Sequence, residues 1–181
     1  LWLLKKRFGN DEVQEAISNY FIGTSKTSGT GYYCIDRKML ITSCKVINYV
    51  DFNRDKNFPP YYPFKTTDGY YPCLFGLHLV DNNKKIKLVE SEKTAFIASI
   101  VYPEVTWISC GGTNNLTADK CKDLKGYDHA IDLIPDCDEA GRSAMKKWQH
   151  NLSVFGVSSQ VVDLGAEYVN SEDLADLLIN D

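Results

Sequence analysis

Apolar and polar positions alternate in blocks along the second half of the chain. Short apolar runs bounded by turn residues predict strands at residues 86–89, 105–109, 130–134 and 160–164. Longer stretches with apolar residues at helical spacing predict helices at residues 93–101, 116–124, 141–155 and 171–179. This alternating order predicts an α/β fold, in which helices flank a parallel four-stranded sheet. Ligands of such sheets bind outside the carboxyl ends of the strands.

The first part of the chain has a different pattern. An apolar stripe at helical spacing predicts one helix that ends before Gly23, and strands are expected at residues 31–35 and 40–50. A long loop that holds four of the six prolines follows these strands. We therefore predict two domains, a smaller α+β lobe at residues 1–82 and an α/β domain at residues 83–181.

The composition narrows the class of protein. The chain has 181 residues, of which 44% are hydrophobic, and no run approaches the roughly 18 apolar residues of a membrane helix. No signal peptide pattern is present, so we predict a cytoplasmic protein without a membrane partner. The six cysteines form no C-x-x-C pair and no zinc spacing with the three histidines, which argues against a structural zinc within this stretch.

The charge and the first residue of the chain limit what its partners can be. A non-specific duplex binder carries a basic excess, whereas the net charge here is −4. Any contact with nucleic acid is therefore expected through a local patch, through metal ions or through a partner domain. Because the chain begins with Leu1 rather than Met, we interpret it as a piece of a longer protein or as a processed product. A zinc-binding module or a helicase can then lie outside this fragment.

Two acidic clusters follow predicted strands. The first is Glu90-Ser91-Glu92-Lys93 and the second is Asp136-Cys137-Asp138. If these two strands are neighbours, their carboxylates converge at one edge of the sheet, where Mg²⁺ or Mn²⁺ would relieve the repulsion between them. The alternative for the second cluster is a solvated turn or a helix N-cap. An EF-hand is excluded, because position 12 of a loop that starts at Asp136 is Lys147 rather than Glu.

Residues 85–155 resemble a Toprim domain, the module shared by bacterial-type primases, topoisomerases and certain nucleases. The primase branch, including phage primase-helicases and Toprim proteins of mobile elements, carries a first motif E-G-E-K/I-D and a second motif D-x-D-x-A-G. Here they read Glu90-Ser91-Glu92-Lys93-Thr94 and Asp136-Cys137-Asp138-Glu139-Ala140-Gly141. Looser likenesses lie at Leu74-Phe75-Gly76-Leu77-His78, at Ser109-Cys110-Gly111-Gly112 and at Glu172-Asp173-Leu174-Ala175-Asp176-Leu177. Ser91 departs from the usual glycine.

The resemblance implies a role for each matching residue. Glu90 would be the catalytic acid or base and a metal-linked glutamate, and Asp136 and Asp138 would hold Mg²⁺ or Mn²⁺. Candidates for a second metal or its support are Glu92, Asp173 and Asp176. Lys93 could meet a phosphate, and Gly111, Gly112 and Gly141 would set the backbone geometry. The alternatives are a surface or N-cap carboxylate for Glu92 and a helix-surface lysine for Lys93.

The resemblance also implies a function. The leading hypothesis is the Toprim catalytic core of a DNA primase-like protein, a nucleotidyltransferase that joins nucleoside triphosphates on a single-stranded DNA template with Mg²⁺. A second hypothesis is a Toprim-type nuclease that uses the same carboxylates for hydrolysis. A third is a non-catalytic module that binds replication proteins. The sequence leaves these three open, because the same carboxylates serve attack by a 3′-hydroxyl or by water.

Overall fold

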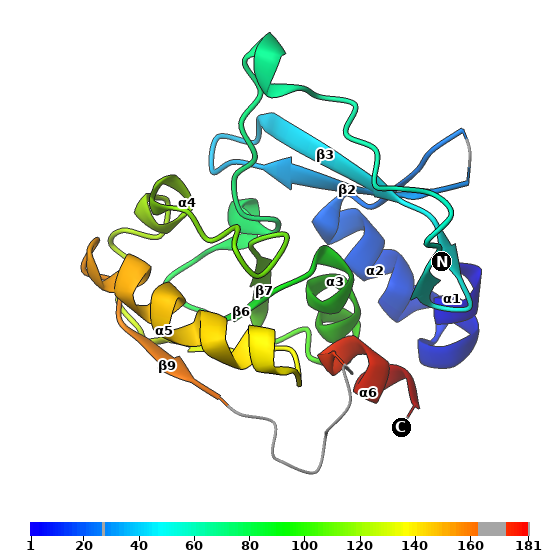
Figure 1. Ribbon diagram of the computed structural model, residues 1–181. Helices are drawn as coiled ribbons and strands as arrows, with labels where there is room; N and C mark the ends of the chain where they lie inside the picture. Colours follow the sequence, from blue (N-terminus) through cyan, green and yellow to red (C-terminus); the bar gives the residue numbers. More distant parts are fainter. Residues whose placement is uncertain (27, 163–172, 181) are drawn as a thin grey trace. The chain divides into compact units, whose positions relative to one another are not determined.

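The computed structural model describes residues 1–26, 28–162 and 173–180, which fall into two compact units, Leu1–His78 and Leu79–Asp181 (Figure 1). Each unit has its own sheet and its own buried core. The predicted boundary at residues 82 and 83 lies a few residues beyond this division. That these two parts are separate domains stays a prediction.

The first unit combines helices with small antiparallel sheets. Two helices, α1 (Trp2–Phe8) and α2 (Asn10–Tyr20), precede the strands. A three-stranded sheet has the order β1-β2-β3, and a separate hairpin pairs β4 with β5. The bounds are β1 Gly23–Thr24, β2 Thr30–Ile35, β3 Ile41–Ile47, β4 Tyr49–Val50 and β5 Asn53–Arg54, followed by short 3-10 turns at Thr66–Asp68 and Leu77–Leu79. Helix α1 was not predicted from the sequence.

One strand of this unit is shorter than predicted. The expected strand at residues 40–50 ends at Ile47, and residues 49–50 turn back against β5. Between β4 and β5 stand Asp51 and Phe52, whose φ angles of 46° and 67° are both positive. Two positive φ angles form the tight turn that suits a two-residue hairpin loop, so residues 49–50 pair within this hairpin and do not extend β3.

The segment before the second unit is part of the core of the first. Leu74 and Phe75 are 0% and 1% exposed. The Phe75 ring lies 5.3 Å from that of Tyr20 and 5.8 Å from that of Tyr32, measured between centroids. The residues that resemble a primase segment therefore close the core of the lobe, and aromatic packing between helix α2 and strand β2 gives the physical reason for them.

The second unit is the predicted parallel sheet. Its strand order is β7-β6-β8-β9, and all three pairings are parallel. The strands are β6 Ile86–Val89, β7 Thr106–Ser109, β8 Ile131–Leu133 and β9 Ser159–Val161. The helices are α3 Glu92–Val101, α4 Ala118–Lys122, α5 Glu139–Ser153 and α6 Leu174–Asn180. The order of elements agrees with the sequence pattern. Part of the predicted last strand, residues 163–164, and the start of the last helix, residues 171–172, lie outside the described residues.

Helices lie on both faces of this sheet. The chain moves one way from β6 to β7 and the other way from β7 through β8 to β9, so right-handed crossovers put α3 on one face and α4 and α5 on the other. Helix α6 packs beside α3, as Figure 1 shows, and α4 packs against α5. Trp107 and Trp148 are 2% and 1% exposed and help to fill the core. Within the described residues, no helix is both long and apolar enough to span a membrane.

Candidate metal centre

The two acidic clusters follow neighbouring strands at the centre of the sheet. Glu90 comes directly after β6, and Asp136 lies three residues beyond the end of β8. The two strands are in parallel register at Leu88 and Leu133, and the Ile134 N–H donates to the Leu88 carbonyl at 3.0 Å. The sequence argument required this adjacency. The connection from β6 runs to β7 on one side, and the connection from β8 runs to β9 on the other. The gap between β6 and β8 is therefore the switch point, where parallel sheets bind ligands.

Asp136 lies where the negative charges of the site meet. The pKa of Asp136 is raised to about 7, first by burial and then by the nearby charges of Glu90, Asp173 and Asp138 in that order. Lys93 acts in the opposite sense and lowers this pKa. Four carboxyl groups from three separate parts of the chain therefore act on one another at this edge of the sheet.

Asp138 has a structural contact of its own. It is the N-cap of helix α5, and its Oδ1 accepts a hydrogen bond from the Gly141 N–H at 2.6 Å. The N-cap alternative from the sequence is therefore realised for this residue. The cap fixes the side chain at the sheet edge, and a carboxylate has enough acceptor positions to cap a helix and bind a cation together.

Glycines shape the backbone around the carboxylates. A Cβ at Gly141 would lie 2.7 Å from the Asp136 carbonyl oxygen and 2.9 Å from the Asp136 nitrogen, which leaves no room for a side chain. Gly111 has a φ angle of +83°, and a Cβ there would lie 2.9 Å from Glu92 Oε1. Gly112 has a φ angle of +145°. Side chains are strained at such angles, so the loop after β7 needs both glycines.

Glu92 stands at the first position of α3 and is 4% exposed. The pKa of the neighbouring Cys110 thiol is raised to about 12, mainly by burial, and the charges of Glu90 and Glu92 act in the same direction. Glu92 is therefore a buried carboxylate near Glu90 and the Gly111 loop, which is not the surface position offered as its alternative.

Lys120 is a site residue that the sequence analysis missed. This lysine of α4 is only 8% exposed, and its Nζ donates to the Cys110 carbonyl at 2.7 Å. This hydrogen bond fixes the backbone of the loop that carries Gly111. A lysine in a short polar helix gives no sequence signal of such burial, because only the position of α4 under the loop produces the contact.

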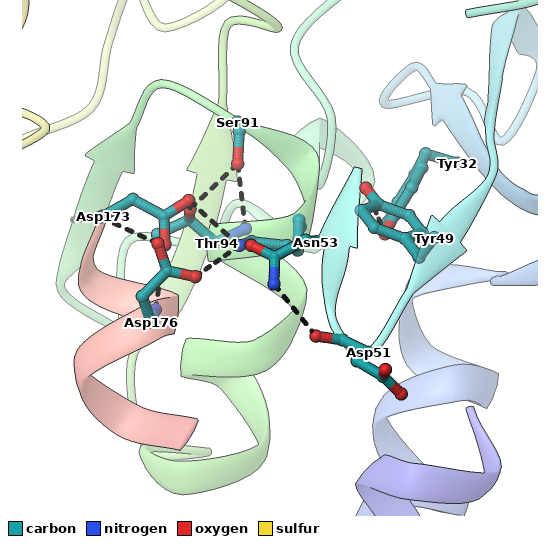
Figure 2. A network of polar contacts seen from close by, with 9 residues as sticks. Tyr32, Tyr49, Asp51, Asn53, Ser91, Thr94, Asp173 and Asp176 are labelled. Carbon is teal, nitrogen blue, oxygen red and sulfur yellow. Dashed lines mark hydrogen bonds and ion pairs between the residues drawn. The ribbon is translucent and has the colours of Figure 1, made fainter. Parts of the chain in front are cut away.

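Helix α6 brings the late acidic residues to the start of α3. Lys93 Nζ lies 2.8 Å from Asp176 Oδ1 and 3.3 Å from Asp173 Oδ2. The Thr94 hydroxyl donates to Asp173 Oδ2 at 3.1 Å, and the Ser91 and Thr94 hydroxyl oxygens are 2.8 Å apart (Figure 2). Glu172, from the same late motif, lies outside the described residues.

Lys93 is therefore not a solvated lysine on the helix surface. Its ammonium group points toward the acidic cluster. Its side chain is 16% exposed. Burial lowers the pKa of Lys93, but the charges of Asp173 and Asp176 and their hydrogen bonds outweigh burial and raise it overall. The ammonium group stays charged and neutralises part of the negative charge at this edge.

The donor set of the acidic edge suits a hard divalent cation. Within the described residues, no three His, Cys, Asp or Glu side chains are already placed as a complete metal-holding group. The donors gathered around Asp136 are nevertheless all carboxylates, and their charges raise the pKa of Asp136. Mg²⁺ and Mn²⁺ prefer such oxygen donors and retain several waters, so a few carboxylates are enough. Glu90, Asp136 and Asp138 have the donor chemistry that such an ion requires.

Comparisons with known proteins give a family and a fold. A family model described as "Domain of unknown function (DUF6371)" matches residues 1–137. No curated protein matches the chain. Among solved structures, the primase fragment of the bacteriophage T7 primase-helicase is 22% identical with a TM-score of 0.68, and the match covers 92% of this chain and 65% of that fragment.

Two bacterial primases are similar to the chain as well. A DNA primase domain from Pseudomonas aeruginosa is 17% identical with a TM-score of 0.62, and the match covers 98% of this chain and 58% of that domain. The Escherichia coli primase catalytic core is 17% identical with a TM-score of 0.62, over 96% of this chain and 58% of the core. The chain spans less than two thirds of each of these three structures. Together with the parallel sheet, they confirm the predicted fold class, the Toprim-type fold of primases.

Proposed function

The chain belongs to the DUF6371 family, a domain of unknown function, and we propose that it is the Toprim catalytic core of a primase-like protein. It would join nucleoside triphosphates on a single-stranded DNA template with Mg²⁺ or Mn²⁺. The proposal includes a place in DNA replication, in the setting of a mobile element.

One observation carries this proposal. The charges of Glu90, Asp138 and Asp173 all act on Asp136 at the switch point between β6 and β8. Carboxylates are costly to gather in this way unless a cation or a proton compensates them. A structural role would not need this arrangement at the one edge of the sheet where ligands bind.

Each residue would have a definite part in the reaction. Asp136, Asp138 and Glu90 would hold the ion, which when bound supplies positive charge to the phosphates and helps to align in-line attack. Glu90 would take the proton of the attacking 3′-hydroxyl on its carboxylate, as a general base. Lys120 and the glycine loop would keep the Cys110–Gly111 backbone in place beside Glu90. Positioning and charge neutralisation supply most of phosphoryl-transfer catalysis.

The neighbouring structures support the substrates of the proposal. A DnaG primase catalytic domain was solved with single-stranded DNA, and the match covers 98% of this chain at 18% identity. Primase domains of the phage T7 protein were solved with an RNA/DNA hybrid and dTTP. We propose single-stranded DNA and nucleoside triphosphates as partners of this chain, with a helicase or a zinc-binding module elsewhere in the longer protein.

The test is a synthesis assay. The full-length protein that contains this chain is incubated with single-stranded DNA, labelled nucleoside triphosphates and Mg²⁺ or Mn²⁺. Short template-dependent oligonucleotides are expected, and Glu90→Gln should remove most of them at a cost in stability below about 1.5 kcal/mol. The matched control is Glu104→Gln, because Glu104 is an exposed glutamate of the same unit. It should retain full activity.

Other outcomes of the same assay would replace the proposal. Template degradation without synthesis, abolished by Asp136→Asn, would establish the nuclease that shares these carboxylates. If neither reaction occurs over a range of metals and salt, the chain is a non-catalytic module that binds replication proteins. A large loss of melting temperature in Glu90→Gln, with activity per folded molecule retained, would make Glu90 structural.

A further inference from the structure

Lys93 places a fixed positive charge inside the acidic edge of the sheet. Its Nζ contacts both late aspartates, at 2.8 Å from Asp176 Oδ1 and 3.3 Å from Asp173 Oδ2. The three side chains are 16%, 30% and 17% exposed for Lys93, Asp176 and Asp173. Its charge also reaches Asp136, the residue at the centre of the cluster. One ammonium group is therefore paired with both late aspartates.

All four carboxylate oxygens of the two late aspartates already accept a hydrogen bond or an ion pair. Asp173 Oδ1 accepts from the Asp176 N–H at 2.9 Å, and Asp176 Oδ2 accepts from the Asp173 N–H at 3.3 Å. Asp173 Oδ2 accepts from the Thr94 hydroxyl (Figure 2). Lys93 Nζ is a second partner of Asp173 Oδ2 and also donates to Asp176 Oδ1. A metal ion bound to these oxygens would have to displace the ammonium group and break the helix start.

The ammonium group also opposes a second ion by its charge. A divalent cation at the late aspartates would come within a few ångströms of Lys93 Nζ, in a partly buried site where water screens poorly. Within the described residues, Glu90, Asp136 and Asp138 make no ion pair with Lys93, whose close contacts go to the two late aspartates. Of the two groups of carboxylates, only Glu90, Asp136 and Asp138 are thus left to bind a metal ion.

We propose that the Lys93 ammonium takes the place of a second metal ion, so that this edge binds a single divalent cation at Asp136, Asp138 and Glu90. The inference rests on the proposed metal centre and assigns Asp173 and Asp176 to Lys93 instead of to a metal. Lys93 is a positioning residue in this account: it holds α6 on α3 and keeps Asp173 beside Asp136.

The test counts bound Mn²⁺ by calorimetric titration and by electron paramagnetic resonance, at pH 8 and without nucleotide or DNA. The intact chain should bind one Mn²⁺. Lys93→Met roughly keeps the length of the side chain but removes its charge, and this variant should bind two Mn²⁺ ions. The second ion should bind at least about tenfold more tightly than any second ion binds to the unsubstituted chain. Lys93→Arg keeps the charge and should bind one.

The control is Lys87→Met. Lys87 lies on β6 with its Nζ 3.9 Å from Asp132 Oδ2, so it is also a partly buried, ion-paired lysine of this unit. It should leave the count at one. Two Mn²⁺ on the unsubstituted chain would overturn the inference even if Lys93→Met does not fold, and so would a count of one in a folded Lys93→Met. No binding at all would overturn the proposed metal centre itself, together with this inference.

Discussion

At the scale of single residues, Asp136 links the stability of the chain to pH. The pKa of Asp136 is about 7 in the folded chain against an ordinary 3.8, with burial as the main cause and Glu90 next. Between these values the folded state holds more protons than the unfolded state, so the free energy of unfolding falls as pH rises from about 4 to about 7. In EDTA at pH 8, Asp136→Asn should therefore be more stable than the unsubstituted chain.

The gain should be roughly 1–2 kcal/mol, less than the shift gives at about 1.4 kcal/mol per pKa unit, because water reaches part of the carboxyl group. Urea unfolding at pH 4 and at pH 8 measures it, and the gain should vanish at pH 4. Glu104→Gln, an exposed control, should show no such dependence on pH. A gain in Asp136→Asn of equal size at both pH values would show that the carboxyl group is not strained in the folded chain.

Gly141 is the second residue whose role can be measured by itself. A Cβ at this position would lie 2.7 Å from the Asp136 carbonyl oxygen, and this neighbour is backbone rather than a flexible side chain. Gly141→Ala should therefore lower the free energy of unfolding by about 1–3 kcal/mol, although alanine favours helices. It should also weaken Mn²⁺ binding, since Asp136 has to move.

The comparison is Ser143→Ala, an exposed position two residues further along the same helix, which should change stability by less than about 0.5 kcal/mol. Thermal and urea unfolding of both variants provide the measurement. Equal free energies of unfolding for Gly141→Ala and the unsubstituted chain would mean that the backbone before α5 shifts to accept a Cβ without loss of stability.

At the scale of elements, the join between α3 and α6 depends on hydroxyl groups. Ser91 is the N-cap of α3 and accepts from the Thr94 N–H at 3.1 Å, and the Thr94 hydroxyl donates to Asp173 at the start of α6. Thr94 is 1% exposed, so loss of its hydroxyl removes one of the two donors to Asp173 Oδ2 in a mostly buried setting. Thr94→Val should reduce the free energy of unfolding by about 1–2 kcal/mol.

The matched control for this join is Thr94→Ser, which removes a methyl group but keeps the hydroxyl and should retain proteolytic resistance of the α6 end. Limited proteolysis with mass spectrometry, alongside urea unfolding, separates release of α6 from general destabilisation. Early cleavage near α6 in Thr94→Ser but not in Thr94→Val would contradict the role given to the hydroxyl.

At the scale of the whole molecule, the net charge of −4 sets how the chain meets DNA. The net negative charge repels phosphates, so binding is expected to depend on a few lysines and on the bound ion. Binding of single-stranded DNA by this chain alone should be weak. With about three phosphate contacts it should fall roughly 20-fold between 50 and 200 mM salt, and fluorescence anisotropy measures this. Tight binding that does not change with salt would rule out this electrostatic account.

The sequence by itself determined the parallel sheet and the strand ends that carry Glu90 and Asp136, because both follow from local periodicity and from the order of elements. It also suggested an acidic edge, since carboxyl ends of neighbouring parallel strands meet there. The pairing of Lys93 with Asp176, 83 residues away, came only from the tertiary structure. So did the burial of Lys120 beneath the Cys110 loop. Such contacts depend on how helices pack across a folded sheet, and no local pattern of residues encodes that packing.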